Sequence, residues 1–343
     1  MGRELPQSRE QAHGAACVGV SRARGLPWVG TPGPRRSAVI SRSRVLLGVA
    51  LSLAPAAAPP AVASAQVVPA AATAPAADNA RAWRPATDLK LARELTLLGI
   101  GGGFQTVFRL MSRPGQPVPP PGLDPGTIAL AIDRSVVGIG SASADDASDW
   151  ARDASVAFAL GMMAATAGRE DPVRELARRG LVYAETALIS HGLTYLGKRA
   201  LARPRPFAYR PESDRPSGSA YDVTKGGAFE SMPSGHASSA WTAATLGMTE
   251  HLLSRPEASG LERVGVGLLG GGLAGATSAL RVAAGQHFPT DVLLSAGIGL
   301  LTGVTIPLLH RGERPMPTRR AWLEMSVGAA AGVLVGIVVA MGY

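Results

Sequence analysis

From Ser148 onward, long apolar segments recur along the chain, and this pattern restricts the possible fold more than any other feature. The segments cover residues 154–168, 180–197, 237–253, 264–280, 290–309 and 323–343. Most are 15–20 residues long and carry at most one or two charges, close to the ~20 residues that a helix needs to cross a bilayer. A chain in lipid must satisfy its own backbone hydrogen bonds, so we expect an all-α helical bundle with about six membrane-spanning helices.

The composition agrees with helices that pack closely in a membrane. Hydrophobic residues make up 46% of the chain, aromatic residues only 5%, and glycine occurs 42 times. Glycine inside a soluble helix costs about 1 kcal/mol relative to alanine, whereas small residues let membrane helices approach one another. Two of the apolar segments carry a glycine at every fourth position: Gly267, Gly271 and Gly275, and Gly328, Gly332 and Gly336. Packing inside the bundle is the favoured use of these stripes, and a homodimer face is the alternative.

The sequence divides into a leader, a linker and a helical domain. Residues 1–65 end in an arginine-rich stretch, a short apolar core and Ala63-Ser64-Ala65, which is typical of a signal peptide cleaved near Ala65/Gln66. Residues 66–147 are predicted to be a linker and a peripheral N-terminal segment, in which 91–111 could form a helix that does not span. The helical domain is expected over residues 148–343.

The arginines predict the orientation of the helices. The connections at 169–179, 254–263 and 310–320 carry arginines, and the positive-inside rule places them in the cytoplasm. The connections at 198–235 and 281–289 then face outward, and a cleaved signal peptide also places the mature N-terminus outside. We therefore expect a protein of the inner (plasma) membrane whose outward connections lie in the periplasm.

The outward connections hold eight residues that form a chemically sensible set: Lys198, Arg205, Ser234, Gly235, His236, Arg281, His287 and Asp291. Lysine and arginine side chains suit phosphate oxygens, and a Ser-Gly turn at a helix start offers backbone N–H groups to an anion. His287 and Asp291 are four residues apart, so an imidazole oriented by the carboxylate could act as a nucleophile while His236 protonates a leaving oxygen. No cluster of acidic residues accompanies the set, so we expect neither a metal nor another cofactor in it.

These residues lie in three motifs, K-x6-RP at Lys198, PSGH at Pro233 and R-x5-H-x3-D at Arg281. In this order and at these separations the motifs resemble those of the type 2 phosphatidic acid phosphatase superfamily, in its membrane-associated bacterial branch. The resemblance implies that His287 attacks phosphorus, Asp291 orients it and His236 is the general acid. It further implies a set of phosphate-binding residues: Lys198, Arg205, Ser234, Gly235 and Arg281. Leu280 departs from the family pattern, which often has serine before the arginine.

The resemblance implies a metal-independent phosphatase that acts through a phosphohistidine on a lipid phosphomonoester or pyrophosphate at the periplasmic face. Its expected partners are a phosphorylated lipid and the membrane. Nucleic acid is not expected, because no basic stripe with interleaved aromatic residues occurs. The main alternative is a soluble periplasmic non-specific acid phosphatase of the same superfamily. A vanadium haloperoxidase and a non-catalytic transporter or scaffold are further alternatives.

Three other ionisable residues in or near the apolar segments are expected to play no part in catalysis. Glu185 falls inside the second segment and is interpreted as a buried packing or pairing group. His251 and His310 fall at the expected cytoplasmic ends of helices, where solvated side chains are expected.

Overall fold

The fold was analysed in a computed structural model of the chain, which describes residues 87–111, 122–167, 171–224 and 227–343. The chain divides into two units, Met1–Ala76 and Ala77–Tyr343. The first unit lies wholly outside the described residues, and with it the predicted leader and cleavage site. All that follows concerns the second unit.

The described residues form helices and no strands, which confirms the expected all-α class. The long helices are α2 (Leu91–Met111), α4 (Ala142–Ala165), α5 (Pro172–Leu201), α6 (Gly235–Ser254), α7 (Gly260–Ala283), α8 (Pro289–Leu309) and α9 (Arg319–Ala340). A short helix, α3 (Ala131–Arg134), precedes α4. The connection between α5 and α6 contains three single-turn helices: η2 (Pro206–Tyr209), η3 (Glu212–Asp214) and η4 (Ser219–Tyr221).

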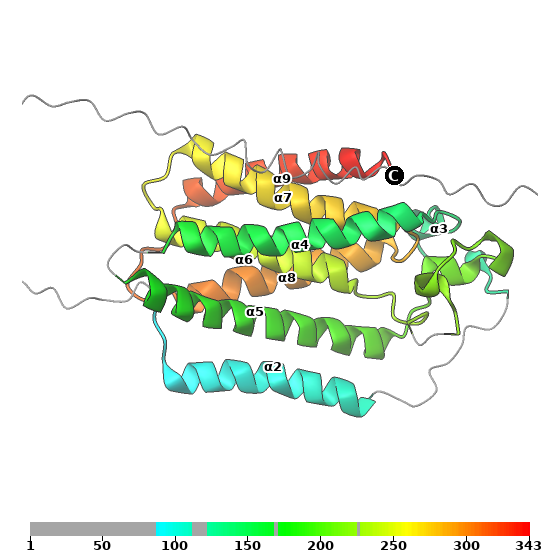
Figure 1. Ribbon diagram of the computed structural model, residues 1–343, viewed down its shortest axis with the longest axis horizontal. Helices are drawn as coiled ribbons and strands as arrows, with labels where there is room; N and C mark the ends of the chain where they lie inside the picture. The colour runs from blue at the N-terminus through cyan, green and yellow to red at the C-terminus, as the bar shows by residue number, and fades with distance from the viewer. Residues whose placement is uncertain (1–86, 112–121, 168–170, 225–226) are drawn as a thin grey trace, which may run out of the picture. The chain divides into compact units, whose positions relative to one another are not determined.

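The long helices pack side by side (Figure 1). Helix α6 is central, because it contacts α4, α5, α7 and α8. Helix α9 packs chiefly against α7, and α2 packs against α5. The largest apolar core lies where α4, α6, α7 and α9 meet and includes Phe158, Met248, Leu252 and Met325. A smaller core joins α2, α5 and α8 through Leu97, Val182, Ile189 and Ile306.

Each of the six apolar segments falls on one of the helices α4–α9, and residues 91–111 form α2. Three helices, α7, α8 and α9, are long and apolar enough to cross a membrane. They also expose large apolar side chains, among them Leu293, Leu301 and Val338, as lipid-facing helices do. These helices fit an association with the membrane, and the count of six spans stays a prediction.

The two glycine stripes pack against each other, as expected for a use inside the bundle. A Cβ atom built on Gly271 of α7 would lie 2.2 Å from the backbone oxygen of Ala329, and one on Gly332 of α9 would lie 2.1 Å from that of Leu268. The remaining glycines of the stripes show the same kind of contact with the backbone of the facing helix. Because these glycines have no side chains, the backbones of α7 and α9 can approach each other this closely.

A pair of alanine substitutions in α7 tests this packing. Gly271→Ala is expected to lower the thermal stability of the purified protein, because the new methyl group meets backbone and must push α9 away. Gly265→Ala is the matched control, since a Cβ there has no neighbour within 4 Å. The control should be neutral or stabilising, because alanine is favoured over glycine in a helix by about 1 kcal/mol. Equal melting temperatures for the two variants would contradict the proposed packing.

Candidate active site

The eight predicted residues come together where α5 ends, α6 and α8 begin and α7 ends. Backbone hydrogen bonds hold the connections in place: Arg205 N–H donates to Ala228 O over 2.8 Å, and Phe207 N–H donates to Gly285 O over 3.1 Å. A cavity of about 310 Å³ opens between them, with Arg205, His236 and Arg281 in its wall. The connection between α5 and α6 supplies further wall residues at Ser219, Ala220, Asp222, Gly227 and Ala228.

His287 is held rigidly in the connection between α7 and α8. Its side chain is only 1% exposed, and its Nδ1 donates to the backbone oxygen of Ser231 over 2.6 Å. With the proton on Nδ1, the lone pair is on Nε2, which makes Nε2 the nucleophilic atom. Burial, and then the charges of Arg205 and Arg281, hold the pKa of His287 well below its ordinary value. The imidazole is therefore neutral at physiological pH.

Asp291 acts on His287 less directly than expected. Its Oδ2 lies 3.9 Å from Nδ1 of His287, too far for a hydrogen bond. The carboxylate instead accepts from the N–H of Phe288 over 2.8 Å, which caps the start of α8, and also from Ser231 Oγ. Because Ser231 O in turn accepts from His287, the influence of Asp291 on the imidazole passes through Ser231.

Three cations lie around His287: Lys198 and Arg281 are buried, and Arg205 is half-buried. Lys198 Nζ donates to Glu230 O over 2.8 Å, and Arg205 Nε donates to Gly227 O over 2.7 Å. Arg281 donates to Ser148 Oγ over 3.1 Å and pairs with Asp145. Burial, and then the charge of Arg205, lower the pKa of Lys198 to about 7. The position that the three cations surround therefore strongly favours an anion.

The start of α6 adds backbone donors to the site. Ser234 is the N-cap of the helix, and its Oγ accepts from the N–H of Ala237 over 3.4 Å. Ser295 on α8 fixes the turn by accepting from the N–H of Ser234 over 2.8 Å. The expectation that the Ser-Gly pair opens a helix is confirmed. The first N–H groups of such a helix can bind an anion.

His236, in the first turn of α6, makes a hydrogen bond that no local sequence pattern predicts. Its Nε2 lies 2.6 Å from Oδ1 of Asp149 on α4. Burial, and then the positive charges of Arg281 and Arg152, lower the pKa of His236 to about 4 although Asp149 opposes the shift. A phosphate dianion beside Arg281 would offset these positive charges and favour the protonated imidazole.

Two acidic residues in the cavity wall, Asp145 and Asp149, were missed from the sequence, although they pair with Arg281 and His236. They belong to "DDASDWARD", in which aspartates at 145, 149 and 153 follow the i, i+4 spacing of one helix face. This spacing could have found them. The predicted domain began at Ser148 and its first apolar segment at 154, whereas α4 begins at Ala142 and carries both residues into the site.

Arg203 was also missed. It donates to Asp291 over 2.6 Å and to Asp133 over 2.8 Å, and its guanidinium lies 4.0 Å from the centre of the Phe288 ring. The residue thus fixes the carboxylate that caps α8. No local signal identifies it, because its partners are 70 and 88 residues away in the sequence.

The predicted residues differ in their access to the cavity. Arg205, His236 and Arg281 line it, together with Gln286. Lys198 and His287 are not in its wall, but their charges interact with those of Arg205 and Arg281. Ser234 is fully buried as the cap of α6. The arrangement brings positive charge and two histidines together, which suits the binding of a phosphate group.

Comparison with known proteins supports the same assignment. Residues 179–315, which contain all eight predicted residues, match the model of the PAP2 superfamily. No curated protein and no solved structure matches the chain. The match covers α5 from Arg179 onward, α6, α7 and α8, and it includes every residue of the cavity wall except Asp145 and Asp149 of α4. The region that holds the candidate site, residues 179–315, is therefore assigned to the PAP2 superfamily, the type 2 phosphatidic acid phosphatases that its motifs resemble.

Proposed function

We propose that the protein is a phosphatase that hydrolyses a lipid phosphomonoester or pyrophosphate at the outer face of the membrane. The observation that carries the proposal is that Lys198, Arg205 and Arg281 converge with His287 and His236, and that Arg205, Arg281 and His236 line one cavity. Membership of the PAP2 superfamily supports hydrolysis of a phosphate ester.

The proposed reaction has two steps. Nε2 of His287 attacks phosphorus, the bond from phosphorus to the ester oxygen breaks, and the leaving oxygen takes a proton from His236. Water then attacks the phosphohistidine and gives a proton to His236, and the phosphorus–nitrogen bond breaks to release phosphate and neutral His287. In-line displacement requires the two histidines on opposite sides of phosphorus.

The cations and the start of α6 would stabilise the equatorial oxygens of the transition state. Preorganised donors aimed at developing charge are a large contribution to catalysis. Arg205 and Arg281 supply two permanent positive charges and Lys198 a third below about pH 7, so the proposed chemistry needs no metal ion. Asp145 and Asp149 are engaged with Arg281 and His236, which makes them positioning residues.

A lipid substrate fits the place of the cavity in the fold. Arg281 lies in the last turn of α7 and His287 precedes α8, so the cavity lies at the ends of two helices that are apolar enough to cross a membrane. A lipid phosphate would reach such a cavity from the interface without leaving the bilayer.

Phosphate release from a panel of substrates tests the proposed activity. Membranes that contain the protein should hydrolyse phosphatidic acid, phosphatidylglycerol phosphate or undecaprenyl pyrophosphate faster than glucose 6-phosphate. Activity confined to a soluble periplasmic fraction would favour the acid phosphatase alternative. Vanadate-dependent halide oxidation would favour a haloperoxidase, and failure to release phosphate from any substrate would contradict a hydrolase.

The reaction is expected to slow as the pH rises. Lys198 has a lowered pKa of about 7, so it is charged below this pH and loses its charge above it, which weakens phosphate binding. His236 must carry a proton to act as the acid, and its lowered pKa also favours activity at low pH. A plot of kcat/KM against pH for an alkyl phosphate should fall more steeply above about pH 7. In Lys198→Arg, which keeps its charge, this additional slope should vanish; an unchanged profile would contradict the role of Lys198.

Single-cysteine variants can test on which side of the membrane the cavity lies. In a Cys17→Ser background, Ser219→Cys in η4 and Met316→Cys between α8 and α9 introduce thiols at exposed positions. An impermeant maleimide added to spheroplasts should label position 219 at once and position 316 only after lysis. The reverse pattern would place the cavity in the cytoplasm, and equal labelling would contradict a membrane-spanning arrangement.

A further inference from the structure

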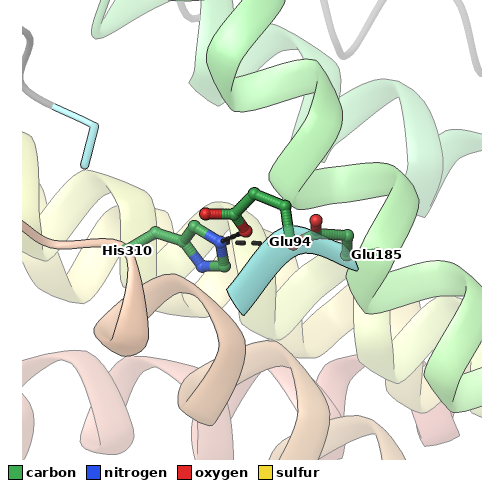
Figure 2. A group of neighbouring side chains, drawn as sticks. All are labelled: Glu94, Glu185 and His310. Carbon is green, nitrogen blue, oxygen red and sulfur yellow. Dashed lines mark hydrogen bonds and ion pairs between the residues drawn. The ribbon is translucent and has the colours of Figure 1, made fainter. Parts of the chain in front are cut away.

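A second cluster of ionisable side chains lies outside the active site, at the far end of α8. It consists of Glu94 on α2, Glu185 on α5 and His310, the residue that ends α8 (Figure 2). One ligand atom from each residue lies within 4.8 Å of the others. Helix α8 has 21 residues, so at about 1.5 Å per residue the cluster is roughly 30 Å from its catalytic end.

The cluster is buried, which corrects the expectation that His310 is solvated. His310 and Glu185 are fully buried and Glu94 is 6% exposed. His251, the other histidine expected to be solvated, is also buried at 3% exposure. Glu185 is buried as expected, but neither of its carboxylate oxygens has a hydrogen-bond partner among the described residues. Leaving a buried carboxylate without a partner is strongly unfavourable, so this group requires an explanation.

The hydrogen bonds of His310 direct its free nitrogen at the two carboxylates. Nδ1 donates to the backbone oxygen of Ile306 over 2.7 Å, which leaves the lone pair on Nε2. Nε2 lies 2.7 Å from Oε2 of Glu94 and 3.2 Å from Oε2 of Glu185. Figure 2 shows the imidazole and the two carboxylates turned toward one another. With a neutral imidazole, three electron-pair donors meet and no hydrogen-bond donor lies between them, so either a further proton or a metal ion must hold them together.

We propose that Glu94, Glu185 and His310 bind a divalent transition-metal ion of the Zn²⁺ type. Imidazole nitrogen with carboxylate oxygens suits such ions better than Mg²⁺ or Ca²⁺, which prefer oxygen ligands throughout. A tetrahedral ion with bonds of about 2.0–2.1 Å needs ligand atoms about 3.3 Å apart. The observed separations approach this value, so small side-chain rotations would complete the site.

The surroundings of the cluster are those of a metal site. The ring nitrogen of a ligating histidine that does not bind the metal commonly donates a hydrogen bond through its N–H to a backbone oxygen, as Nδ1 of His310 does to Ile306 O. The other oxygen of Glu94 accepts from Arg93 over 2.8 Å and from the N–H of Lys90 over 2.6 Å, which leaves Oε2 facing His310. Arg93 also offsets one of the two carboxylate charges.

The ion would fix α2 to the helical bundle. Near the cluster, the N–H of Asp88 donates to His310 O over 3.0 Å and Arg93 donates to Leu309 O over 2.5 Å. The three ligands come from helices that are distant in sequence, so one ion would tie α2, α5 and α8 together. Its role is structural, because the proposed catalytic residues lie at the opposite end of α8 and include none of the ligands.

Metal content and thermal stability test the site. The full chain, purified in detergent with a tag that lacks histidine, is stripped with a chelator, dialysed, and reloaded with ZnCl₂. Wild type should retain about one Zn²⁺ per chain, Co²⁺ should give a d–d absorption spectrum typical of low coordination number, and both ions should raise Tm. In Glu185→Gln and His310→Gln the affinity for Zn²⁺ should fall by more than the roughly 10–100-fold that loss of an outer partner causes.

Glu185→Gln keeps the side-chain shape and removes an unpaired charge, so the stripped variant should be at least as stable as stripped wild type but should show no rise in Tm with Zn²⁺. His251→Gln, which replaces another buried histidine, is the matched control and should bind Zn²⁺ as wild type does. Wild type that retains no metal, with Tm independent of Zn²⁺, would overturn the proposal and indicate that a proton alone holds the cluster. Equal Zn²⁺ retention in wild type, Glu185→Gln and His310→Gln would also overturn it.

Discussion

Replacement of His287 by asparagine is expected to reduce phosphate release to the uncatalysed background with every substrate. The proposed reaction passes through a bond between phosphorus and Nε2 of this residue, and the asparagine amide is a very weak nucleophile there. Asparagine is chosen because its side-chain NH₂ can still donate to Ser231 O in place of Nδ1–H. The measurement is trapping of labelled phosphoenzyme by a quench in alkaline detergent, together with steady-state phosphate release.

Two controls separate lost chemistry from lost folding in the His287→Asn variant. Its Tm should remain within a few degrees of wild type, and vanadate should still raise Tm, because Lys198, Arg205 and Arg281 remain to bind the anion. Wild type should form an acid-labile, base-stable phosphoenzyme, as expected for phosphohistidine. A phosphoenzyme of the same yield in His287→Asn would assign the nucleophile to another residue.

Replacement of His236 by alanine is expected to change substrate preference more than phosphoenzyme formation. General acid catalysis contributes roughly 10²–10⁴-fold, and its loss harms most the leaving groups that need a proton. The value of kcat/KM should therefore fall by about 10²–10⁴-fold for an alkyl phosphate, and far less for p-nitrophenyl phosphate, whose leaving group needs little protonation. The measurement is the ratio of the two kcat/KM values in wild type and variant.

Asp149→Asn tests the same role of His236 with a smaller expected effect than His236→Ala. The carboxylate of Asp149 opposes the lowering of the pKa of His236, so its loss should lower that pKa further and shift the alkyl phosphate profile toward acid. The aryl substrate should respond little to either substitution. If His236→Ala slows both esters equally, His236 binds the phosphate and does not protonate the leaving group.

Much of the fold and most of the candidate site were predictable because their signals are local. The apolar segments predicted the positions of α4–α9, and Ser234-Gly235 predicted the start of α6, because helix periodicity and caps depend on neighbouring residues. The motifs predicted which residues gather around the cavity, since a family pattern records residues that are close in the folded state. The glycine spacing on α7 and α9 predicted that these helices pack closely.

Only the tertiary structure decided which hydrogen-bond and ion-pair partners these residues have. The sequence by itself predicted the helical class, the resemblance to the PAP2 superfamily and the eight candidate residues. It could not show that Asp149 pairs with His236, that Ser231 O fixes the tautomer of His287, or that Arg203 holds Asp291. Nor could it bring Glu94 to Glu185 and His310. Each of these contacts joins segments that are distant along the chain, and their distances depend on how whole helices pack, which no local pattern of residues encodes.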